Sequence, residues 1–289
     1  YNNSILLENK IQNKKYNIFY YDQKNLSIVN SKVFAKGLFI KFNYKNKKFF
    51  KILKKQTLNL ANCKFLLIRQ DPPFKLEYIS ATYILDRIKN KVKIVNNPTS
   101  IRNISEKLYS AKYQRFMPGT IFTQDLSEIQ NFIKKHKKII LKPIHSYSGN
   151  DIHLLNSFNS KFINKFINKH HHIMCQKFPP KISNGDKRVF IINGKVHGAI
   201  SRVPKKGSFL SNMSKGAKPT NTKLTSIENK ISKLIAKDLK KEDIFFAGID
   251  FIDQKLNGDI NVTSPTGLKT FFDLSGKNLA KTFWKELKA

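Results

Sequence analysis

The sequence predicts a mixed α/β and α+β protein, with an N-terminal α/β domain over residues 1–98 and a second domain over residues 99–289. The first observation is a strand–turn–helix–strand pattern before Pro98, which is typical of a unit built on a parallel sheet. The second is a further series of strands and helices with different content after Pro98. The third is length, because 289 residues are enough for two or three lobes that each bury a core.

The N-terminal domain is expected to hold one helix and several strands ahead of that unit. Apolar residues at helical spacing predict the first helix, and a continuous apolar run before the polar turn at Arg69 predicts a buried strand. One-sided apolar spacing predicts the helix of the unit. The predicted elements are a helix over 4–14, a strand over 16–21, a strand-like region over 26–55, a strand over 64–68, a helix over 76–90 and a strand over 92–95.

The second domain continues with alternating strand and helix signals. One helix begins at Asp125-Leu126-Ser127-Glu128, which matches a capping box. A loop rich in Gly, Ser and Lys is expected over 203–221. The other predicted elements are helix 101–112, strands 119–123, 138–141 and 151–155, helix 160–168, strands 172–178, 187–193 and 196–202, helix 226–240, strands 245–252 and 259–263, and a final helix near 275–288.

Positive charge dominates the composition, with 54 Lys and Arg against 19 Asp and Glu and a formal net charge of +35. Such a charge is typical of nucleic-acid binding, since lysines neutralise phosphates and release counterions. Here nearly all the positive residues are lysine, dispersed along the chain among abundant Asn, Ile and Phe, as AT-rich codons would give. We therefore expect no specific nucleic-acid partner, although a basic nucleic-acid-binding protein stays an alternative. The 40% hydrophobic content excludes a disordered polyelectrolyte.

The cysteines and the hydropathy predict a cytoplasmic protein. Cys63 and Cys175 lie in apolar contexts without the spacing of a metal or redox motif, so we expect two buried thiols in a reducing compartment. No run approaches the roughly 18 apolar residues of a membrane span, and the first residues lack a signal-peptide pattern. A membrane partner is not expected.

Acidic residues near the C-terminus suggest a metal site. If Asp250 and Asp259 lie on neighbouring antiparallel strands joined by the turn 255–258, their carboxylates and the Asn261 amide can converge on one point. Hard oxygen ligands with positions to spare for water and phosphate are what Mg²⁺ requires. A solvated hairpin with ordinary surface acids is the alternative. The metal hypothesis predicts that Asp250→Asn lowers turnover about a hundredfold or more with little change in stability.

Two lysines and one small-residue loop suggest phosphate binding. Lys142 ends an apolar strand and Lys107 lies in a predicted helix, and a lysine at a strand end is a point charge that can hold phosphates. Directly after Lys142, the loop 145–150 could offer backbone N–H groups to a phosphate, although it contains a single glycine, Gly149. Solvated lysines and a plain hairpin turn are the alternatives.

Arginine is scarce in this lysine-rich chain, so Arg188 and Arg202 at the edges of two predicted strands are informative. A retained arginine indicates bidentate contact with a carboxylate or a phosphate, or a structural ion pair. The run His170-His171-His172 is interpreted as an exposed cluster, because adjacent histidines point in different directions.

Several short segments resemble bacterial glutathione synthase, a member of the ATP-grasp superfamily, across nearly the whole chain. The runs DPPF (71–74), ATYIL (81–85) and INVTSPT (260–266) are specific to that family, whereas the lysines and the acidic hairpin are shared by ATP-grasp ligases in general. The other matching segments are 95–98, 105–108, 140–143 and 184–189.

The resemblance implies an α/β domain that helps bind a peptide, followed by a two-lobed ATP-grasp domain that holds ATP between antiparallel sheets. It implies that the reaction is the ATP-dependent ligation of γ-glutamylcysteine and glycine through an acylphosphate, in a cytoplasmic homo-oligomer, by resemblance a tetramer. A closed loop over 203–221 would keep water from the intermediate.

The resemblance also implies a role for each matching residue. The cofactor would be Mg²⁺, with Mn²⁺ as a substitute, and ATP would be a co-substrate. The implied ATP contacts are Lys107, Lys142, Gly149, Gln176, Lys177, Phe178 and Asp186; the metal ligands are Asp250, Asp259 and Asn261; Arg188 and Arg202 act on the transferred phosphoryl group; and Arg69, Arg202, Ser264 and Thr266 hold the substrate.

This chain also departs from the family pattern. The glycine-rich phosphate loop keeps only Gly149, a usual arginine of the lid is Leu210, and the metal-ligating glutamate is Asp259, after a hairpin with one extra residue. The first strand of the family and the loop after it are expected to be missing from this sequence before Tyr1. A relative that binds nucleotide with reduced or lost activity is therefore an alternative to an active ligase.

Overall fold

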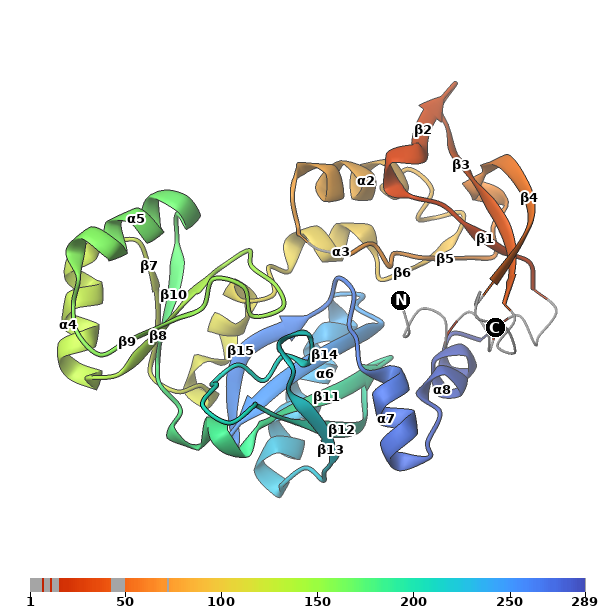
Figure 1. The fold of residues 1–289 in the computed structure, drawn as a ribbon. Helices are drawn as coiled ribbons and strands as arrows, with labels where there is room; N and C mark the ends of the chain where they lie inside the picture. Colours follow the sequence, from red (N-terminus) through yellow and green to blue (C-terminus); the bar gives the residue numbers. More distant parts are fainter. Residues whose placement is uncertain (1–6, 8–10, 12–15, 43–49, 72, 289) are drawn as a thin grey trace.

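The computed structural model describes residues 7, 11, 16–42, 50–71 and 73–288, and it has three parts (Figure 1). An N-terminal domain is followed by a small lobe and a large lobe, each built on an antiparallel sheet. The predicted mixed α/β and α+β class is confirmed. No helix within the described ranges is long and apolar enough to span a membrane.

The N-terminal domain combines an antiparallel sheet with the predicted parallel unit. Strands β5 and β6 pair in parallel, with Leu66 opposite Ile94, and α2 connects them, so that prediction is confirmed. Most of the helix predicted over 4–14 lies outside the described residues. The elements are β1 Ile18–Tyr20, β2 Leu26–Val29, β3 Lys32–Phe42, β4 Phe50–Asn59, β5 Phe65–Leu67, α2 Leu76–Asp86, β6 Lys93–Val95 and α3 Pro98–Asn103, with 3-10 turns at Gln23–Asn25 and Leu60–Asn62.

The small lobe is a four-stranded antiparallel sheet of order β7-β10-β8-β9 with α4 and α5 packed against it. Asp125 caps α4 by accepting the Ser127 and Glu128 N–H groups. Both helices have apolar residues at helical spacing, which bury Ile129, Ile133, Ile163 and Phe166 against the sheet. The elements are β7 Thr120–Thr123, α4 Leu126–His136, β8 Ile139–Pro143, β9 His153–Leu155, α5 Ser160–His170 and β10 Ile173–Lys177.

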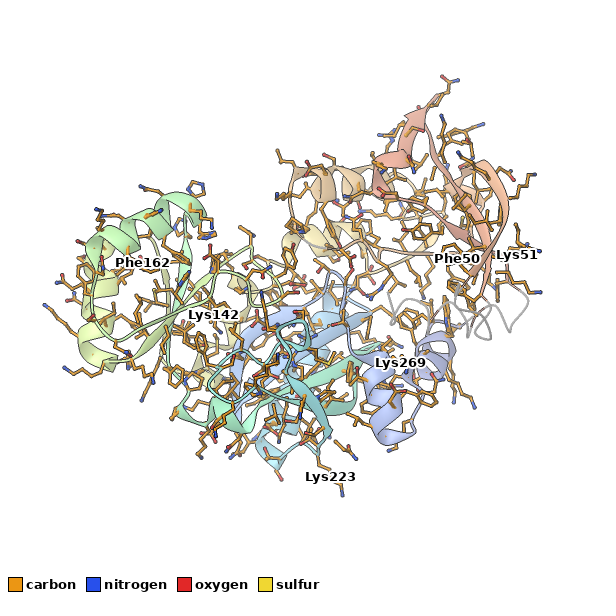
Figure 2. All side chains as sticks on the ribbon, in the orientation of Figure 1. Phe50, Lys51, Lys142, Phe162, Lys223 and Lys269 are labelled. Carbon is orange, nitrogen blue, oxygen red and sulfur yellow. The ribbon has the colours of Figure 1, made fainter. Side chains whose placement is uncertain are left out.

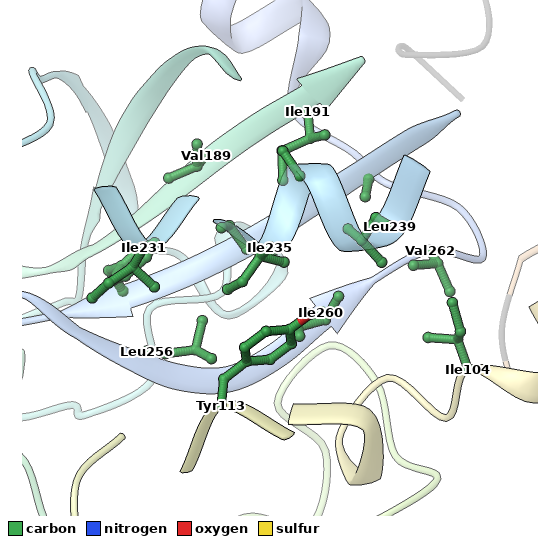
Figure 3. Packing of buried hydrophobic residues seen from close by; sticks show 14 of the residues in the cluster. Ile104, Tyr113, Val189, Ile191, Ile231, Ile235, Leu239, Leu256, Ile260 and Val262 are labelled. Carbon is green, nitrogen blue, oxygen red and sulfur yellow. The ribbon is translucent and has the colours of Figure 1, made fainter. Parts of the chain in front are cut away.

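The large lobe is a five-stranded antiparallel sheet of order β13-β12-β11-β14-β15. Helix α6 covers one face, and Figure 3 shows its Ile231, Ile235 and Leu239 among the residues of the central core. Helices α7 and α8 pack near one end of the other face. The elements are β11 Asp186–Ile192, β12 Lys195–Val203, β13 Lys218–Asn221, α6 Ser226–Lys241, β14 Phe246–Ile252, β15 Lys255–Asn261, α7 Leu268–Ser275 and α8 Leu279–Glu286.

The helix predicted over 101–112 is wrong, and tertiary contacts explain why. Helix α3 ends at Asn103, and a 3-10 segment follows over Leu108–Phe116. Between them, the Glu106 carbonyl accepts the Ile260 N–H of β15 at 3.0 Å, so this stretch follows the sheet instead of continuing the helix. Lys107 consequently lies just before the 3-10 segment, outside any α-helix.

Other boundaries also differ from the prediction. The last hairpin turns at residues 253–254, so residues 255–258, expected to form the turn, belong to β15. The single final helix is two helices, because Gly276 in the left-handed region (φ +69°) ends α7 and Asn278 caps α8. The predicted loop over 203–221 ends in a strand, since β13 pairs with β12 with Ser201 opposite Thr220. The irregular part of this segment is therefore shorter than predicted.

Candidate active site

The alternation of residues along the large-lobe strands places polar side chains on the face opposite α6. On β11, Val189 and Ile191 join the core under α6, so Asp186 and Arg188 point to the other face. The register sets Gly248 opposite Asn261 and Ile249 opposite Ile260. Because alternate residues share a face, the side chains of Asp250, Asp259 and Asn261 lie on the same face as those of Asp186 and Arg188, as the sequence predicts for the first three.

Two acids and two arginines form a buried network on this face. Arg188 binds Asp250 through two nitrogens, with Nη2 at 2.7 Å from Oδ2. Arg202 binds Asp186 through Nε and Nη2 at 2.7 and 2.5 Å, and its Nη2 also lies 3.0 Å from Asp250 Oδ2. All four residues are at most 6% exposed. Both arginines thus form structural ion pairs, the competing alternative from the sequence, and they do so with bidentate geometry.

The burial of Asp250 overturns one expectation from the sequence. A solvated hairpin acid could be replaced by Asn with little loss of stability, but Asp250 is 3% exposed and bonded to two guanidinium groups. Removing one partner of a buried ion pair leaves an uncompensated charge. Asp250→Asn must therefore lower the free energy of unfolding as well.

The two acids of the network differ in their acidity. Burial raises the pKa of Asp186 to about 6, against the opposing charge of Arg202. Burial would also raise the pKa of Asp250, but the charges of Arg188 and Arg202 outweigh it and lower that pKa to about 2. Asp250 is therefore the more firmly ionised acid, because it lies between two guanidinium groups.

Lys142 lies at the interface of the two lobes, at the end of β8, and Figure 2 shows it on the side of the small lobe that faces the large lobe. Its ammonium donates to Gln176 Oε1 at 2.9 Å, to the Asn257 carbonyl at 2.9 Å and to Asn257 Oδ1 at 3.0 Å. All three acceptors are uncharged. Gln176 in turn donates its Nε2 to Thr120 Oγ1 at 3.0 Å, which fixes the amide so that its oxygen faces the ammonium.

The acidity of Lys142 follows from this environment. Burial lowers its pKa to about 8, Asp259 acts in the opposite direction, and Lys107 adds to the lowering. A lysine held by neutral dipoles gains little compensation for the loss of water, so its charged form is less stable than in solution. The approach of an anion would restore the charged form.

Asp259 and Asn261 are the more accessible members of the predicted metal site. The Asp259 side chain is 27% exposed, and one of its oxygens lies 3.5 Å from the Lys107 ammonium. Lys107 also donates to the Ser146 carbonyl at 2.7 Å. Asn261 donates its amide nitrogen to the Gly248 carbonyl at 3.2 Å, which leaves the amide oxygen as the atom that can bind a cation.

The end of β10 and the loop 145–150 contain the other predicted ATP contacts in the small lobe. Gln176 is fully buried, Lys177 is exposed, and the Phe178 ring lies 4.2 Å from the Lys138 ammonium and 6.4 Å from the Phe209 ring. Gly149 adopts φ +70°, and a side chain there would collide with Asn212 of the segment 203–217. Lys215 donates to Asn150 at 2.9 Å, so that segment already contacts the loop 145–150.

Three of the four predicted substrate residues lie where the N-terminal domain meets the segment after β15, whereas Arg202 belongs to the buried network. Arg69 donates to the Pro265 carbonyl at 3.1 Å, and Ser264 donates to the Gln70 carbonyl at 2.8 Å. Thr266 is exposed. The fold thus brings Arg69 and Ser264 together across 195 residues of sequence, counted from position 69 to 264.

The structure separates the histidine run from this site. His171 and His172 are exposed, as the sequence interpretation expects, whereas His170 is partly buried and contacts Asp151 at 2.6 Å. Within the part of the chain that the structure describes, no group of three or more His, Cys, Asp or Glu residues could hold a metal ion. A metal site here would need the Asn261 amide and phosphate oxygens to complete it.

Sequence reasoning missed three residues that organise the site. Asn257 binds the Lys142 ammonium, and the extra residue of the hairpin was the only signal for it. Glu106 and Asn96 bind the backbone beyond Asn261, and both lie in segments that matched the family without an assigned role.

Comparisons with known proteins agree with this geometry. The model of the prokaryotic glutathione synthetase ATP-grasp domain matches residues 106–276, and the model of the N-terminal domain of the same family matches residues 2–102. The glutathione synthetase of Bradyrhizobium diazoefficiens is 33% identical over 285 residues, covering 97% of this chain and 90% of the relative. That of Buchnera aphidicola subsp. Baizongia pistaciae is 36% identical over 270 residues, covering 91% and 82%.

Solved structures show the same fold at low sequence identity. The ATP-grasp ligase PsnB in complex with a minimal precursor superposes with a TM-score of 0.66 at 13% identity, over 99% of this chain and 93% of the other. D-alanyl-alanine synthetase A from Vibrio cholerae gives a TM-score of 0.62 at 13% identity, over 99% and 92%.

Proposed function

Because the chain belongs to the prokaryotic glutathione synthetase family, we propose that it ligates γ-glutamylcysteine to glycine with ATP, releasing ADP and phosphate. Its class is therefore that of a carbon–nitrogen ligase of the ATP-grasp type. The observation that carries the assignment of the site is the buried Lys142 ammonium, which faces the acidic hairpin from the opposite lobe and binds only uncharged acceptors within the described residues.

The first chemical step is attack by the cysteinyl carboxylate oxygen on the γ-phosphorus of ATP, with ADP as the leaving group. Negative charge accumulates on the phosphoryl oxygens during this transfer, so cations fixed in advance give the largest stabilisation. Lys142 and Lys107 are suited to this role, because both ammonium groups are buried at the interface between the lobes. The glycine amine then attacks the acylphosphate carbonyl carbon and expels phosphate.

The residues of the hairpin fit a Mg²⁺ ion, with Mn²⁺ as a substitute, through the chemistry of their donor atoms. Asp259 is partly exposed and Asn261 has its amide nitrogen committed to Gly248, so both offer oxygen to a hard cation. Asp250 lies on the same face and would bind the ion with an oxygen that now accepts from an arginine. When bound, the ion would neutralise phosphate charge. Asp250 is the innermost of the three and shares its oxygens with Arg188 and Arg202.

Arg188 and Arg202 are proposed to act on the transferred phosphoryl group, although each guanidinium group is already paired with a carboxylate. Their charges are already matched by Asp250 and Asp186, which lowers the cost of burying them. An arriving phosphate would compete with these carboxylates for the same N–H groups. Asp186, in the family role, would lie near the ribose of ATP, next to the Gln176, Lys177 and Phe178 strand end that would contact adenine.

The remaining residues are proposed to position the peptide and exclude water. Arg69 contacts the segment after β15, and Ser264 and Thr266 belong to that segment. These three residues, with Arg202 in the family role, would hold substrate carboxylates and amides. The segment 203–217 contacts the loop at Gly149 and would close over the acylphosphate, where water would otherwise hydrolyse it. Leu210 in this segment would contribute apolar cover, because it lacks the charge of an arginine.

ADP release tests the proposal directly. The purified protein should release ADP only when γ-glutamylcysteine, glycine and Mg²⁺ are all present, and a panel of other dipeptides and amino acids should give less. A folded protein that binds ATP without turnover would favour the alternative of a relative with lost activity, which the altered loop at Gly149 motivates.

Cellular location and assembly are separate proposals. A reducing cytoplasm is supported by two free cysteines, Cys63 half-buried and Cys175 buried, and fractionation of cells would test it. Assembly as a homotetramer stays a prediction from the family, and sedimentation of the purified protein would test it.

A further inference from the structure

The backbone just after the proposed metal ligand Asn261 is held on both sides by side chains from other parts of the chain. Strand β15 ends at Asn261, and the next residue, Val262, is fully buried. Figure 3 shows Val262 at the edge of the central core beside Ile104. The β14–β15 ladder ends with Gly248 opposite Asn261, so the N–H and the carbonyl of Val262 are bound by side chains instead.

Glu106 binds the N–H side of this segment. Its Oε1 accepts the Val262 N–H at 2.8 Å, the Thr263 N–H at 3.0 Å and the Thr263 hydroxyl at 2.9 Å. Its own carbonyl accepts the Ile260 N–H at 3.0 Å. One residue therefore binds the backbone on both sides of Asn261.

Asn96 binds the carbonyl side of the same segment. Its Nδ2 donates to the Val262 carbonyl and to the Phe246 carbonyl, both at 2.7 Å. Its Oδ1 accepts the Phe246 and Phe245 N–H groups at 2.8 and 3.0 Å. Asn96 is 3% exposed, so its amide takes the place of the next rung between β14 and the segment after β15.

We propose that Glu106 and Asn96 are positioning residues, which clamp the Val262 peptide and thereby orient Asn261 on one side and Ser264 on the other. This inference rests on the proposed function, because Asn261 is a metal ligand and Ser264 a substrate residue only under that function. Buried N–H and C=O groups without hydrogen-bond partners cost free energy, which favours conformations in which they find other partners. Loss of the clamp would therefore let residues 261–264 move. A metal ligand displaced in this way loses affinity for its ion.

The clamp also explains two parts of the sequence pattern. Glu106 directly precedes Lys107, so the contacts that hold Val262 also fix the backbone that carries the Lys107 ammonium next to Asp259. Asn96 follows β6 of the N-terminal domain and binds two strand ends of the large lobe. The clamp thereby joins the proposed peptide-binding domain to the proposed metal site.

Glu106→Ala is the variant that tests this proposal. We expect it to weaken Mn²⁺ binding in the presence of saturating ADP about tenfold, measured by the electron paramagnetic resonance of free Mn²⁺. We also expect kcat/KM for γ-glutamylcysteine to fall about tenfold or more, through a higher KM as well as a lower kcat. Glu106→Gln keeps an Oε1 acceptor for the same three bonds and should stay within about threefold of the wild type.

Glu228→Ala is the matched control. The Glu228 carboxylate is also buried and accepts a backbone N–H, that of Thr225, together with the Lys187 ammonium, but it lies on α6 across the sheet from the site. It should lower the melting temperature and leave Mn²⁺ binding unchanged. If Glu106→Ala does not fold, Glu106→Asp takes its place, because it keeps the charge and draws the oxygen back by one methylene.

The outcomes separate this proposal from the proposed function. A Glu106→Ala protein that loses stability but binds Mn²⁺ with ADP like the wild type, with unchanged KM and kcat, would overturn the clamp. So would a wild-type protein that binds no Mn²⁺ in the presence of ADP. A wild-type protein that binds Mn²⁺ with ADP and does not ligate would contradict the proposed function alone, and the Mn²⁺ titration of the variants would still decide the clamp.

Discussion

The two sheets that face each other across the candidate site hold their buried charges in opposite ways. In the large lobe, Arg188 and Arg202 are neutralised by Asp250 and Asp186 at hydrogen-bonding distance. In the small lobe, the Lys142 ammonium is bound by the Gln176 side chain from its own sheet and by Asn257 from the large lobe, all neutral groups. Both arrangements avoid an unsatisfied polar group, but only the first compensates charge with charge.

This difference indicates which cation is prepared for an anion. A guanidinium already paired with a carboxylate gains little from a phosphate unless it gives up that partner, whereas an ammonium surrounded by dipoles gains a full opposite charge. The lowered pKa of Lys142, caused first by its burial, is the expected signature of that second state. Lys142 should therefore matter most for turnover, and the arginine network should matter for both stability and turnover.

The largest expected effect is that of Lys142→Met. This change keeps the length of the side chain and removes the charge, so kcat/KM for ATP should fall about a thousandfold while the protein stays folded. ADP release and circular dichroism would measure the two quantities. Lys165→Met, at an exposed position of α5 in the same lobe, is the control and should leave activity within about twofold. A Lys142→Met protein with near-normal turnover would contradict the claim that the Lys142 ammonium is the cation prepared to bind phosphate.

Asp250→Asn should come next, and it should affect two properties at once. Turnover should fall about a hundredfold, and the free energy of unfolding should fall by about 3 kcal/mol, because Arg188 and Arg202 would keep their charges without this partner. Urea denaturation gives the second quantity. Asp86→Asn, which breaks a partly buried pair with Arg102 in the N-terminal domain, should lower stability without a comparable loss of turnover. Unchanged stability in Asp250→Asn would argue against the buried network.

The pH dependence should report the neutral surroundings of Lys142. Its pKa is lowered to about 8, so the free enzyme loses the ammonium as the pH rises through that value, and kcat/KM for ATP should fall about tenfold per unit above it. Bound phosphate favours the charged form, so kcat should hold to higher pH. Lys142→Arg keeps its charge and should lose this descending limb. If the wild type and Lys142→Arg show the same descending limb, that limb belongs to the titration of another group.

The smallest expected effect is that of Asn257→Ala. The variant removes one of the three acceptors of the Lys142 ammonium and keeps the backbone carbonyl, so KM for ATP should rise only about threefold to fivefold. The loss of a dipole that favours the charged form should also move the descending limb of the pH profile to lower pH. A limb that stays in place would show that Asn257 does not tune Lys142.

Much of the fold was predictable because it depends on local patterns. The apolar run before Arg69 and the helix expected after it predict the parallel unit of β5, α2 and β6, which the structure confirms. The predicted helix over 76–90 is shorter, because α2 ends at Asp86, and its apolar residues are not on one side, since Tyr83 is exposed. The antiparallel hairpin expected to bring Asp250 and Asn261 together is present, although its turn lies at 253–254 and not at 255–258. The helix predicted over 101–112 fails, because the Glu106 carbonyl binds Ile260, a partner that lies far along the chain.

The sequence alone determined the class of the fold, the family and the residues able to carry charge at the site, since residue types, spacing and short motifs are local properties of the chain. Only the tertiary structure decided how those charges are compensated. Arg188 meets Asp250, Lys142 meets Asn257 and Glu106 meets Val262 because strands and lobes bring together residues that are distant in sequence. Burial then decides the outcome, since the cost of a charge depends on the groups around it when water is excluded.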